Sequence, residues 1–333
     1  MARKTYRKII TSDKLIKKIN KSNVELAERF LKTKSRDLSP KSIEVYRSNL
    51  NIFFVWNLQH NNNKHFTEIK KLEFSDFFNY AADEMDMGSA RLNNMRSTLS
   101  SLSIFIEKFY DEEYPNFRNV ILSIIDSAPK EQRREKTVLT DEQVEKLLEH
   151  LSKTDSQQAC WLALAVCSGA RFSELLNFEV DLIDKNKTAF GDLFLETTRP
   201  IRTKGRGKGG KMLHKYILRD KFLPFFDDWT EKRAIILKEN GIENNSLFIQ
   251  SNGKPVTTST VQNWTKGFEK YLGVNVYTHS FRHFFVTLLS RKNIPHHLIK
   301  AIVGWEDVGM VEVYNDQTIG EMDFPELENL KNL

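Results

Sequence analysis

Long apolar segments are missing from this 333-residue sequence. Although 40% of the residues are hydrophobic, no apolar run approaches the roughly 18 residues that a membrane-spanning helix needs. The N-terminus also lacks the apolar core of a secretory signal, because residues 1–21 carry eight Lys or Arg and only short apolar pairs. We therefore expect a cytoplasmic protein.

Cysteine is scarce as well, with only Cys160 and Cys167 in the chain. They stand seven residues apart in the apolar run ACWLALAVC, so a helix there would separate their Cα atoms by about 10 Å along its axis. A disulfide spans at most about 7 Å. Neither cysteine has a His or Cys neighbour at zinc-binding spacing. Both are expected to be buried apolar residues, and no metal site is predicted.

Basic charge, in contrast, is concentrated. The net charge is +6, and the excess lies in residues 1–21, 130–136 and 199–211. Such clusters suit a polyphosphate partner, because affinity comes from displacing condensed counterions. A basic run by itself is more often a solvated face or tail, so charge alone leaves nucleic acid as an open candidate.

The length favours two domains, since single cores usually stop growing near about 250–300 residues. After a basic tail at 1–21, Ser39 is placed as an N-cap and Pro40 as the first residue of a helix. Apolar residues then recur at helical spacing at Ile43, Tyr46, Leu50, Phe53 and Phe54, and again at Leu92, Met95, Leu99, Leu102 and Phe105. These patterns predict a small all-helical domain over 22–127.

Residues 128–140 are polar and charged and predict a linker, which ends at Thr140 as the cap of a new helix. The second domain is then expected over 141–333. Helical segments are predicted at 141–152, 159–167, 220–240, 257–271, 281–292 and 296–303. Between them, TAFGDLFLETT and KMLHKYIL alternate in a way that suggests a short sheet. The fold class expected is mainly α, of the α+β kind, with a small antiparallel sheet.

The segment CSGARFSELLNF carries Arg171 and Glu174. If a helix begins after Gly169, the two side chains share a face one turn apart, and the carboxylate can orient the guanidinium. In isolation, a surface ion pair explains this spacing. An arginine that follows a buried helix and is held by a glutamate is nonetheless a good phosphate clamp.

The run TKGRGKGGK mixes glycines with basic residues and suits a mobile hairpin tip. Gly205 and the pair Gly210–Lys211 nearly match a Walker A loop, but Met212 replaces the magnesium-binding Ser or Thr. A strand-like segment follows where that loop requires a helix. A nucleotide-binding loop is therefore rejected.

Two further segments carry polar groups near apolar helices. His279 and Arg282 lie three apart at the start of one helix, and Gly304 is placed to end another, directly before Trp305. Tyr314 lies nine residues beyond that tryptophan. Taken one at a time, the histidine is explained as a cap or core residue and the tyrosine as a packing residue.

Taken together, these segments resemble the tyrosine recombinase (phage integrase) family. Its signature is an arginine, a hairpin lysine, His-x-x-Arg, a Gly followed by His or Trp, and a tyrosine, matched here by Arg171, Lys208, His279, Arg282, Trp305 and Tyr314. The spacings also agree, with 22 residues from Arg282 to Gly304 and nine from Trp305 to Tyr314. LSPKSIEVYRSNL is similar to the opening helix of the family's core-binding domain. The resemblance implies a helical core-binding domain and a catalytic domain that form a C-shaped clamp on DNA.

The resemblance also implies a reaction without metal, ATP or other cofactor. Tyr314 is then the nucleophile, Arg171 and Arg282 hold the phosphate, and His279 assists proton removal. Lys208 is the preferred general acid, with Lys204 and Lys211 as alternatives, and Glu174 orients Arg171. The further DNA contacts assigned are Lys204, Arg206, Lys211, Lys41 and Arg91.

Two features depart from the commonest pattern of the family. Trp305 stands where most members have histidine, although the Cre recombinase branch has tryptophan; indole donates one hydrogen bond but cannot shuttle a proton, so it is expected to position the phosphate and pack the tyrosine helix. The residues before the core-binding domain are also too few for the folded arm-binding domain of lambda-type integrases, so the basic tail is expected to act as a minimal arm or the sites to be simple.

The implied partners are a double-stranded DNA recombination site and a homotetramer that exchanges strands through a Holliday junction, with an accessory DNA-bending or directionality protein left open. A stripe at Leu327, Leu330 and Leu333 is expected to dock on a neighbouring protomer rather than merely to close the domain. The biological role expected is integration or excision of a mobile element or phage. A Xer-type chromosome resolvase is the main alternative; a type IB topoisomerase and a non-catalytic DNA-binding protein are less favoured.

Overall fold

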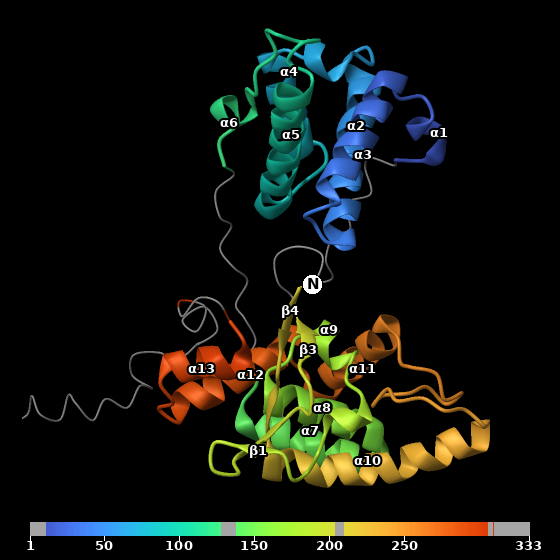
Figure 1. Cartoon of the computed structure of the whole chain (residues 1–333), viewed down its shortest axis with the longest axis vertical. Helices are drawn as coiled ribbons and strands as arrows, with labels where there is room; N and C mark the ends of the chain where they lie inside the picture. The colour runs from blue at the N-terminus through green and yellow to red at the C-terminus, as the bar shows by residue number, and fades with distance from the viewer. Residues whose placement is uncertain (1–10, 128–137, 204–209, 306–308, 310–333) are drawn as a thin grey trace, which may run out of the picture. The chain divides into compact units, whose positions relative to one another are not determined.

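The structure is a computed structural model that describes residues 11–127, 138–203, 210–305 and 309 of the chain. The chain forms two compact units, with the described helices and strands of the first at 13–124 and those of the second at 141–303 (Figure 1). Within the described part of the chain, no helix is both long and apolar enough to cross a lipid bilayer.

The first unit is helical throughout its described residues. Its elements are α1 (Asp13–Ile16), α2 (Lys21–Lys34), α3 (Pro40–His60), the 3-10 helix η1 (Phe66–Glu68), α4 (Lys71–Asp83), α5 (Ser89–Phe109) and α6 (Ile121–Ile124). The predicted start of α3 is confirmed: the Ser42 backbone N–H donates to Ser39 Oγ at 3.2 Å, and Pro40 is the first helical residue. The fixed φ of proline and the side-chain acceptor together determine where this helix begins.

An aromatic cluster from α3, η1 and α4 forms the centre of that unit. Phe53 contacts Phe66 and Phe77 in edge-to-face geometry, with ring centroids 5.8 and 4.9 Å apart, and it stacks on Phe74 at 5.7 Å. All four rings are fully or almost fully buried. Large aromatic side chains bury much apolar area, and these pair geometries add to it, so the unit has a core of its own.

The second unit combines helices with two small sheets, as the fold class predicted. Its elements are α7 (Asp141–Thr154), α8 (Ser156–Ser168), α9 (Phe172–Leu175), the 3-10 helix η2 (Val180–Leu182), β1 (Thr188–Ala189), β2 (Phe194–Glu196), β3 (Ile201–Thr203), β4 (Lys211–Leu213), β5 (Tyr216–Leu218), α10 (Arg219–Asn240), α11 (Thr258–Leu272), α12 (Thr278–Arg291) and α13 (His296–Val303). Thr140 caps α7 as predicted, since Gln143 N–H donates to its hydroxyl at 3.2 Å.

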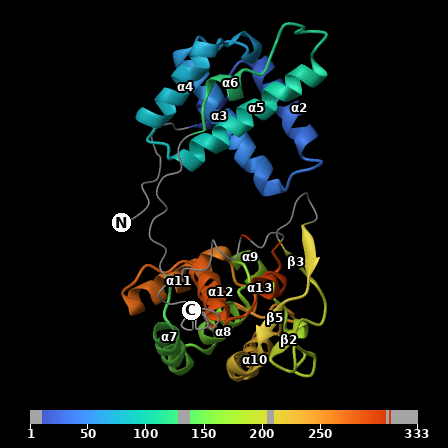
Figure 2. The ribbon, with the colours of Figure 1, turned by 90° about the vertical axis from the view of Figure 1, so that its left-hand side faces the viewer.

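Helix α8 lies inside this unit, with α7, α10 and α12 packed around it (Figures 1 and 2). Every residue from Ala159 to Ser168 is buried, which is the pattern of a helix that is apolar on all sides. Cys160 and Cys167 are both free and buried, as predicted. Burial raises the pKa of the Cys167 thiol to about 12, which keeps it protonated and unreactive near neutral pH.

The strands form two antiparallel sheets, one with the order β1-β2-β5 and one with the order β3-β4. The segment KMLHKYIL was predicted as one strand, and this is wrong: it divides into β4 and β5, which pair with different partners. Leu213 pairs with Ile201 in the smaller sheet, whereas Tyr216 pairs with Glu196 in the larger one. The break places His214 and Lys215 between the two sheets.

Candidate active site

The turn between α8 and α9 positions the first candidate arginine. Gly169 ends α8 with φ at +56°, and a Cβ at this position would lie 2.5 Å from Cδ1 of Phe285. Glycine is therefore required both by the left-handed backbone and by the close approach of α12. The chain reverses here, so that Arg171 directly precedes α9.

Glu174 holds Arg171 by two hydrogen bonds. The Arg171 backbone N–H donates to Glu174 Oε2 and its guanidinium donates to Oε1, both at 2.9 Å. The Glu174 side chain is 1% exposed and that of Arg171 is 21% exposed. The pair is therefore not the surface ion pair that the sequence left open, because its carboxylate is inside the protein while one edge of the guanidinium reaches solvent.

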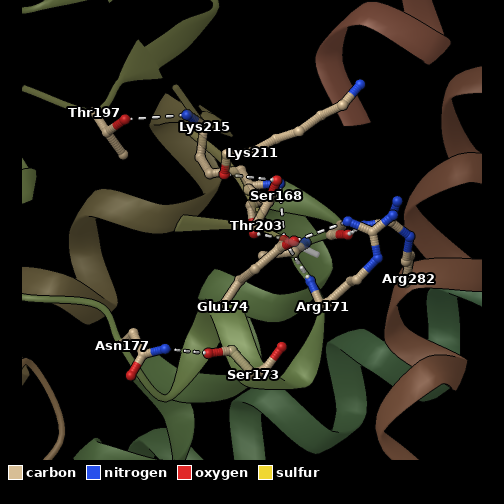
Figure 3. Close-up of polar contacts among 12 residues, drawn as sticks. Ser168, Arg171, Ser173, Glu174, Asn177, Thr197, Thr203, Lys211, Lys215 and Arg282 are labelled. Carbon is tan, nitrogen blue, oxygen red and sulfur yellow. Dashed lines mark hydrogen bonds and ion pairs between the residues drawn. The ribbon is translucent and has the colours of Figure 1, made fainter. Parts of the chain in front are cut away.

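Lys215 contacts the other side of the same carboxylate. Its ammonium lies 2.8 Å from Glu174 Oε2, and both side chains are 1% exposed (Figure 3). Burial by itself would raise the pKa of the Glu174 carboxyl, but the Lys215 charge and the hydrogen bonds from Arg171 outweigh it and hold that pKa below its ordinary value. Burial lowers the pKa of Lys215, and the charges of Arg282 and Arg171 lower it further, against the opposing effect of Glu174.

Arg282 comes from α12 and reaches the same turn. It is 1% exposed, and its guanidinium donates to the carbonyl oxygen of Gly169 at 2.6 Å. Figure 3 shows the guanidinium groups of Arg171 and Arg282 next to each other. Two arginines that are 111 positions apart in sequence thus meet at one turn of the chain. Paired N–H donors in this arrangement match the non-bridging oxygens of a phosphate.

Trp305 packs on the second arginine. Helix α13 ends at Gly304 with φ at +76°, as the sequence predicted, and a Cβ there would lie 2.9 Å from Cδ1 of Leu213. The guanidinium carbon of Arg282 is 4.9 Å from the centroid of the buried Trp305 ring. This cation–π contact fixes the plane of the guanidinium.

His279 lies in the first turn of α12, one turn before Arg282. The helix begins at Thr278, slightly before the predicted start at 281. His279 is exposed whereas Arg282 is buried, so the two residues share a helix face but differ in access to solvent.

Of the remaining predicted site residues, the structure describes Lys211, Lys41 and Arg91. Lys211 is exposed at the start of β4, opposite Thr203 in β3. Lys204, Arg206, Lys208 and Tyr314 lie outside the described residues, as do the leucines of the C-terminal stripe. In the first unit, the exposed Lys41 pairs with Glu44 at 2.7 Å, and the partly buried Arg91 lies 3.5 Å from Ser48 Oγ.

Lys215 is a site residue that was not predicted from the sequence. The sequence did indicate that its side chain is buried. Lys215 and the buried Ile217 are two residues apart, so they fall on one face of a strand-like segment. A lysine in register with a core residue implies a buried partner.

No group of three or more His, Cys, Asp or Glu side chains that could hold a metal is found among the described residues.

Comparison with known proteins identifies related sequences and folds. Residues 137–320 match the Phage integrase family and residues 26–116 match the Phage integrase, N-terminal SAM-like domain. Tyrosine recombinase XerA of Pyrococcus furiosus is 26% identical over 54% of this chain and 57% of its own length, so the alignment spans little more than half of that relative. Tyrosine recombinase XerD of Rickettsia conorii is 23% identical over 84% of this chain and 89% of its own.

Among solved structures, a lambda integrase tetramer bound to a Holliday junction matches with a TM-score of 0.64 at 17% identity, over 90% of this chain and 80% of that one. At that level of identity the match shows a shared fold.

Proposed function

The chain belongs to the phage integrase family, and on that premise we propose that it is a tyrosine site-specific recombinase, which cuts and rejoins DNA through a covalent protein–DNA intermediate. The observation that carries the proposal is the meeting of Arg171 and Arg282 at the Gly169 turn, one held by a buried carboxylate and the other by a carbonyl oxygen and an indole ring. Oriented guanidiniums are what a phosphodiester transition state requires.

Tyr314 is the proposed nucleophile. Its phenolic oxygen forms a bond to phosphorus while the bond from phosphorus to the 5′-oxygen breaks, which leaves a 3′-phosphotyrosyl bond and a free 5′-hydroxyl. A phenol has an ordinary pKa near 10, so only about one part in a thousand is ionised at pH 7. The reaction therefore needs a proton acceptor and strong stabilisation of the pentacoordinate phosphorus.

Arg171 and Arg282 supply that stabilisation. As the tyrosine attacks, the phosphate group goes from one negative charge toward two, and each guanidinium can donate paired N–H groups to a non-bridging oxygen. Trp305 keeps Arg282 in plane and contributes one N–H donor. The arginines are held before DNA arrives, so little reorganisation is needed in the transition state.

Two protons move in this scheme. The phenol proton of Tyr314 passes to His279, whose exposed imidazole can return it to solvent. The leaving 5′-oxygen takes a proton from a lysine of the hairpin between β3 and β4, for which Lys208 is preferred over Lys204 and Lys211. Because the phosphotyrosine conserves the energy of the broken bond, a second 5′-hydroxyl can reverse the attack without ATP.

Strand exchange is proposed to run through a Holliday junction in a homotetramer, in line with the shared fold of the lambda integrase tetramer. The helical unit at 22–127 is proposed as the core-binding domain, with Lys41 and Arg91 on DNA, and residues 141–333 as the catalytic domain. The stripe at Leu327, Leu330 and Leu333 is proposed to dock on the neighbouring protomer. The protein is proposed to act in the cytoplasm, and the role proposed is integration or excision of a mobile element.

Chromosome dimer resolution is the second candidate role. The alignment with XerD supports it, because it extends over 84% of this chain and 89% of that relative. Sequencing the DNA that is covalently trapped on the protein in cells separates the two roles. Sequence reads at the borders of a mobile element would support integration. Reads confined to one chromosomal site would support dimer resolution.

The direct test of the proposed chemistry uses nicked suicide duplexes that carry the DNA flanking the protein's own gene. Wild type, Tyr314→Phe and the control Tyr271→Phe are incubated with them in the presence of a metal chelator. Tyr271 is a suitable control because it stacks on His150 in the second unit, at 4.2 Å between ring centroids. We expect a denaturation-resistant protein–DNA band with wild type and the control, and none with Tyr314→Phe. Tight binding without any band would contradict the recombinase mechanism.

A further inference from the structure

The buried ammonium of Lys215 is unusual for a lysine. Lysine side chains are almost never fully buried unless they are paired, because removing the charge from water is costly. Here the side chain is 1% exposed and its partner, Glu174, is equally buried. The backbone of Lys215 is fixed as well, since its N–H donates to Thr197 Oγ1 and its carbonyl accepts from the Thr197 N–H, both at 3.0 Å.

The hydrogen bonds divide the Glu174 carboxylate between two cations. Oε1 accepts from the Arg171 guanidinium, while Oε2 accepts from the Arg171 backbone and lies 2.8 Å from Lys215 Nζ. Figure 3 shows Lys215 and Arg171 approaching Glu174 from different sides, Lys215 from the segment that leads into β5 and Arg171 from the start of α9. The carboxylate therefore joins the sheet to the candidate phosphate-binding turn.

The charge of this group explains why a lysine is needed. Arg171 and Glu174 alone form a neutral pair, which would offer little attraction to a phosphate. Adding Lys215 gives the three residues one net positive charge, and because the lysine is buried only Arg171 can present that charge to a ligand. Arg282 supplies a second positive charge at the same turn, which suits a phosphate group that develops two negative charges.

We propose that Lys215 is a positioning residue for the cleavage reaction: it holds the Glu174 carboxylate in place and balances its charge, so that Arg171 presents an oriented guanidinium of undiminished charge to the scissile phosphate. This inference rests on the proposed recombinase function. Lys215 itself does not contact DNA in this scheme, since its ammonium lies inside the protein. The groups that face Glu174 are Arg171 from its own turn and Lys215 from the sheet, with Arg282 from α12 acting on Lys215.

The test measures single-turnover cleavage of the suicide duplex at saturating protein, for wild type, Lys215→Met, Glu174→Gln and the double variant. For Lys215→Met we expect the cleavage rate constant to fall between about tenfold and hundredfold, while DNA affinity changes less than about threefold. A role in folding alone would lower the fraction of active protein, and hence the reaction amplitude, but would leave the rate constant of the folded molecules unchanged.

The double variant sharpens the assignment. If Lys215 acts through Glu174, removing both gives a rate constant within about threefold of the slower single variant rather than the product of the two losses. The matched control is Lys187→Met, because Lys187 donates to the carbonyls of Thr197 and Thr198, just after β2, but does not touch Glu174. Its rate constant should equal that of wild type.

Lys215→Gln covers the case in which the methionine variant does not fold. Glutamine keeps an N–H donor for Glu174 but no charge, so its rate constant should also fall by about tenfold or more. Wild-type cleavage together with a wild-type rate constant in folded Lys215→Met or Lys215→Gln would overturn this inference and leave the recombinase function standing. No adduct with wild type would instead overturn the recombinase function itself.

Discussion

The two units of the protein differ in the kind of polar side chain that they bury. In the first unit the buried polar side chains of the described residues are amides and hydroxyls, such as Asn23, Asn49 and Thr98. In the second unit Glu174, Lys215 and Arg282 are all buried. Burying charge is costly unless it is paired, so its accumulation in one unit indicates a task there beyond folding.

A buried charge does not always mark a reactive site, and Arg233 in α10 shows the difference. It donates to the carbonyl of Ser246 at 2.9 Å and to that of Asn244, and so ties a loop to its helix. The cluster around Glu174 differs in having two cations on one carboxylate and a partly exposed guanidinium. This comparison predicts that changes in the first unit alter stability, and that changes in the cluster alter chemistry.

The largest effect on stability is expected from Phe53→Ala. It removes a buried ring that contacts Phe66, Phe74 and Phe77, so the free energy of unfolding of the first unit should fall by about 3–5 kcal/mol. Urea unfolding monitored by circular dichroism measures the change. The control Phe109→Ala alters a ring that is largely exposed and should have a much smaller effect. Equal losses for both variants would contradict an aromatic core centred on Phe53.

Arg171→Ala is expected to lower the cleavage rate rather than the stability. Removing one of two guanidiniums from the transition state should lower the cleavage rate constant by roughly 10²–10³, with little change in stability. Stopped single-turnover reactions on suicide duplexes give that constant. Arg199→Ala is the matched control, because Arg199 is an exposed arginine of the same unit that pairs with Glu179 and Asp181. Comparable losses in both variants would argue against a special role for Arg171.

Gly169→Ala should affect both properties. Positive φ and a Cβ only 2.5 Å from Phe285 should together lower the free energy of unfolding by about 1–3 kcal/mol, and should slow cleavage because the carbonyl that holds Arg282 moves. Gly273→Ala isolates the backbone part of the cost: its φ is +67° but no atom lies within 4 Å of the added Cβ. It should cost about 1 kcal/mol and leave cleavage unchanged. Thermal melts measure the change in stability of each variant, and cleavage assays measure its change in rate.

Acid should weaken the second unit through Glu174. The pKa of this carboxyl is lower in the folded protein than in the unfolded chain, so its contribution to stability is complete above the ordinary glutamate pKa of about 4.3 and is lost as pH falls through the folded value. Urea unfolding at a series of acidic pH values tests this. The free energy of unfolding of Glu174→Gln should decrease less over that range than that of wild type; parallel curves would contradict it.

Lys41→Ala is expected to have the smallest effect on stability. The Lys41–Glu44 pair is exposed, with side chains 84% and 65% accessible, and such pairs contribute about 0–1 kcal/mol. If Lys41 contacts a DNA phosphate, as proposed, the variant should bind DNA more weakly and the slope of log affinity against log salt should decrease by about 1. Fluorescence anisotropy at several salt concentrations measures that slope, and an unchanged slope would remove Lys41 from the interface.

Local sequence patterns predicted several helix ends in this protein. Ser39 with Pro40, Thr140 and Gly304 each mark a boundary because capping depends on residues within one turn. The contact between Arg171 and Glu174 was predictable for the same reason, since the two residues are three apart. Such signals need no knowledge of the rest of the chain.

The partners of these residues were not predictable in the same way. Lys215 meets Glu174 across 41 positions, and the sequence could not show that KMLHKYIL would divide between two sheets. Alternation shows which residues share a face, but the element that covers that face depends on the tertiary fold. The resemblance to a family supplied the grouping of the arginines, and the structure supplied the carbonyl and the ring that hold Arg282.

The hydrogen bond from Arg282 to Gly169 also has a consequence for synthesis of the protein. The two residues are 113 positions apart, so a ribosome adding about 5–20 residues per second makes Arg282 on the order of ten seconds after Gly169. During that time the turn that carries Arg171 exists without its second arginine. The nascent chain therefore cannot assemble the pair of guanidiniums, and a truncated product that ends before α12 should be inactive in the proposed cleavage reaction.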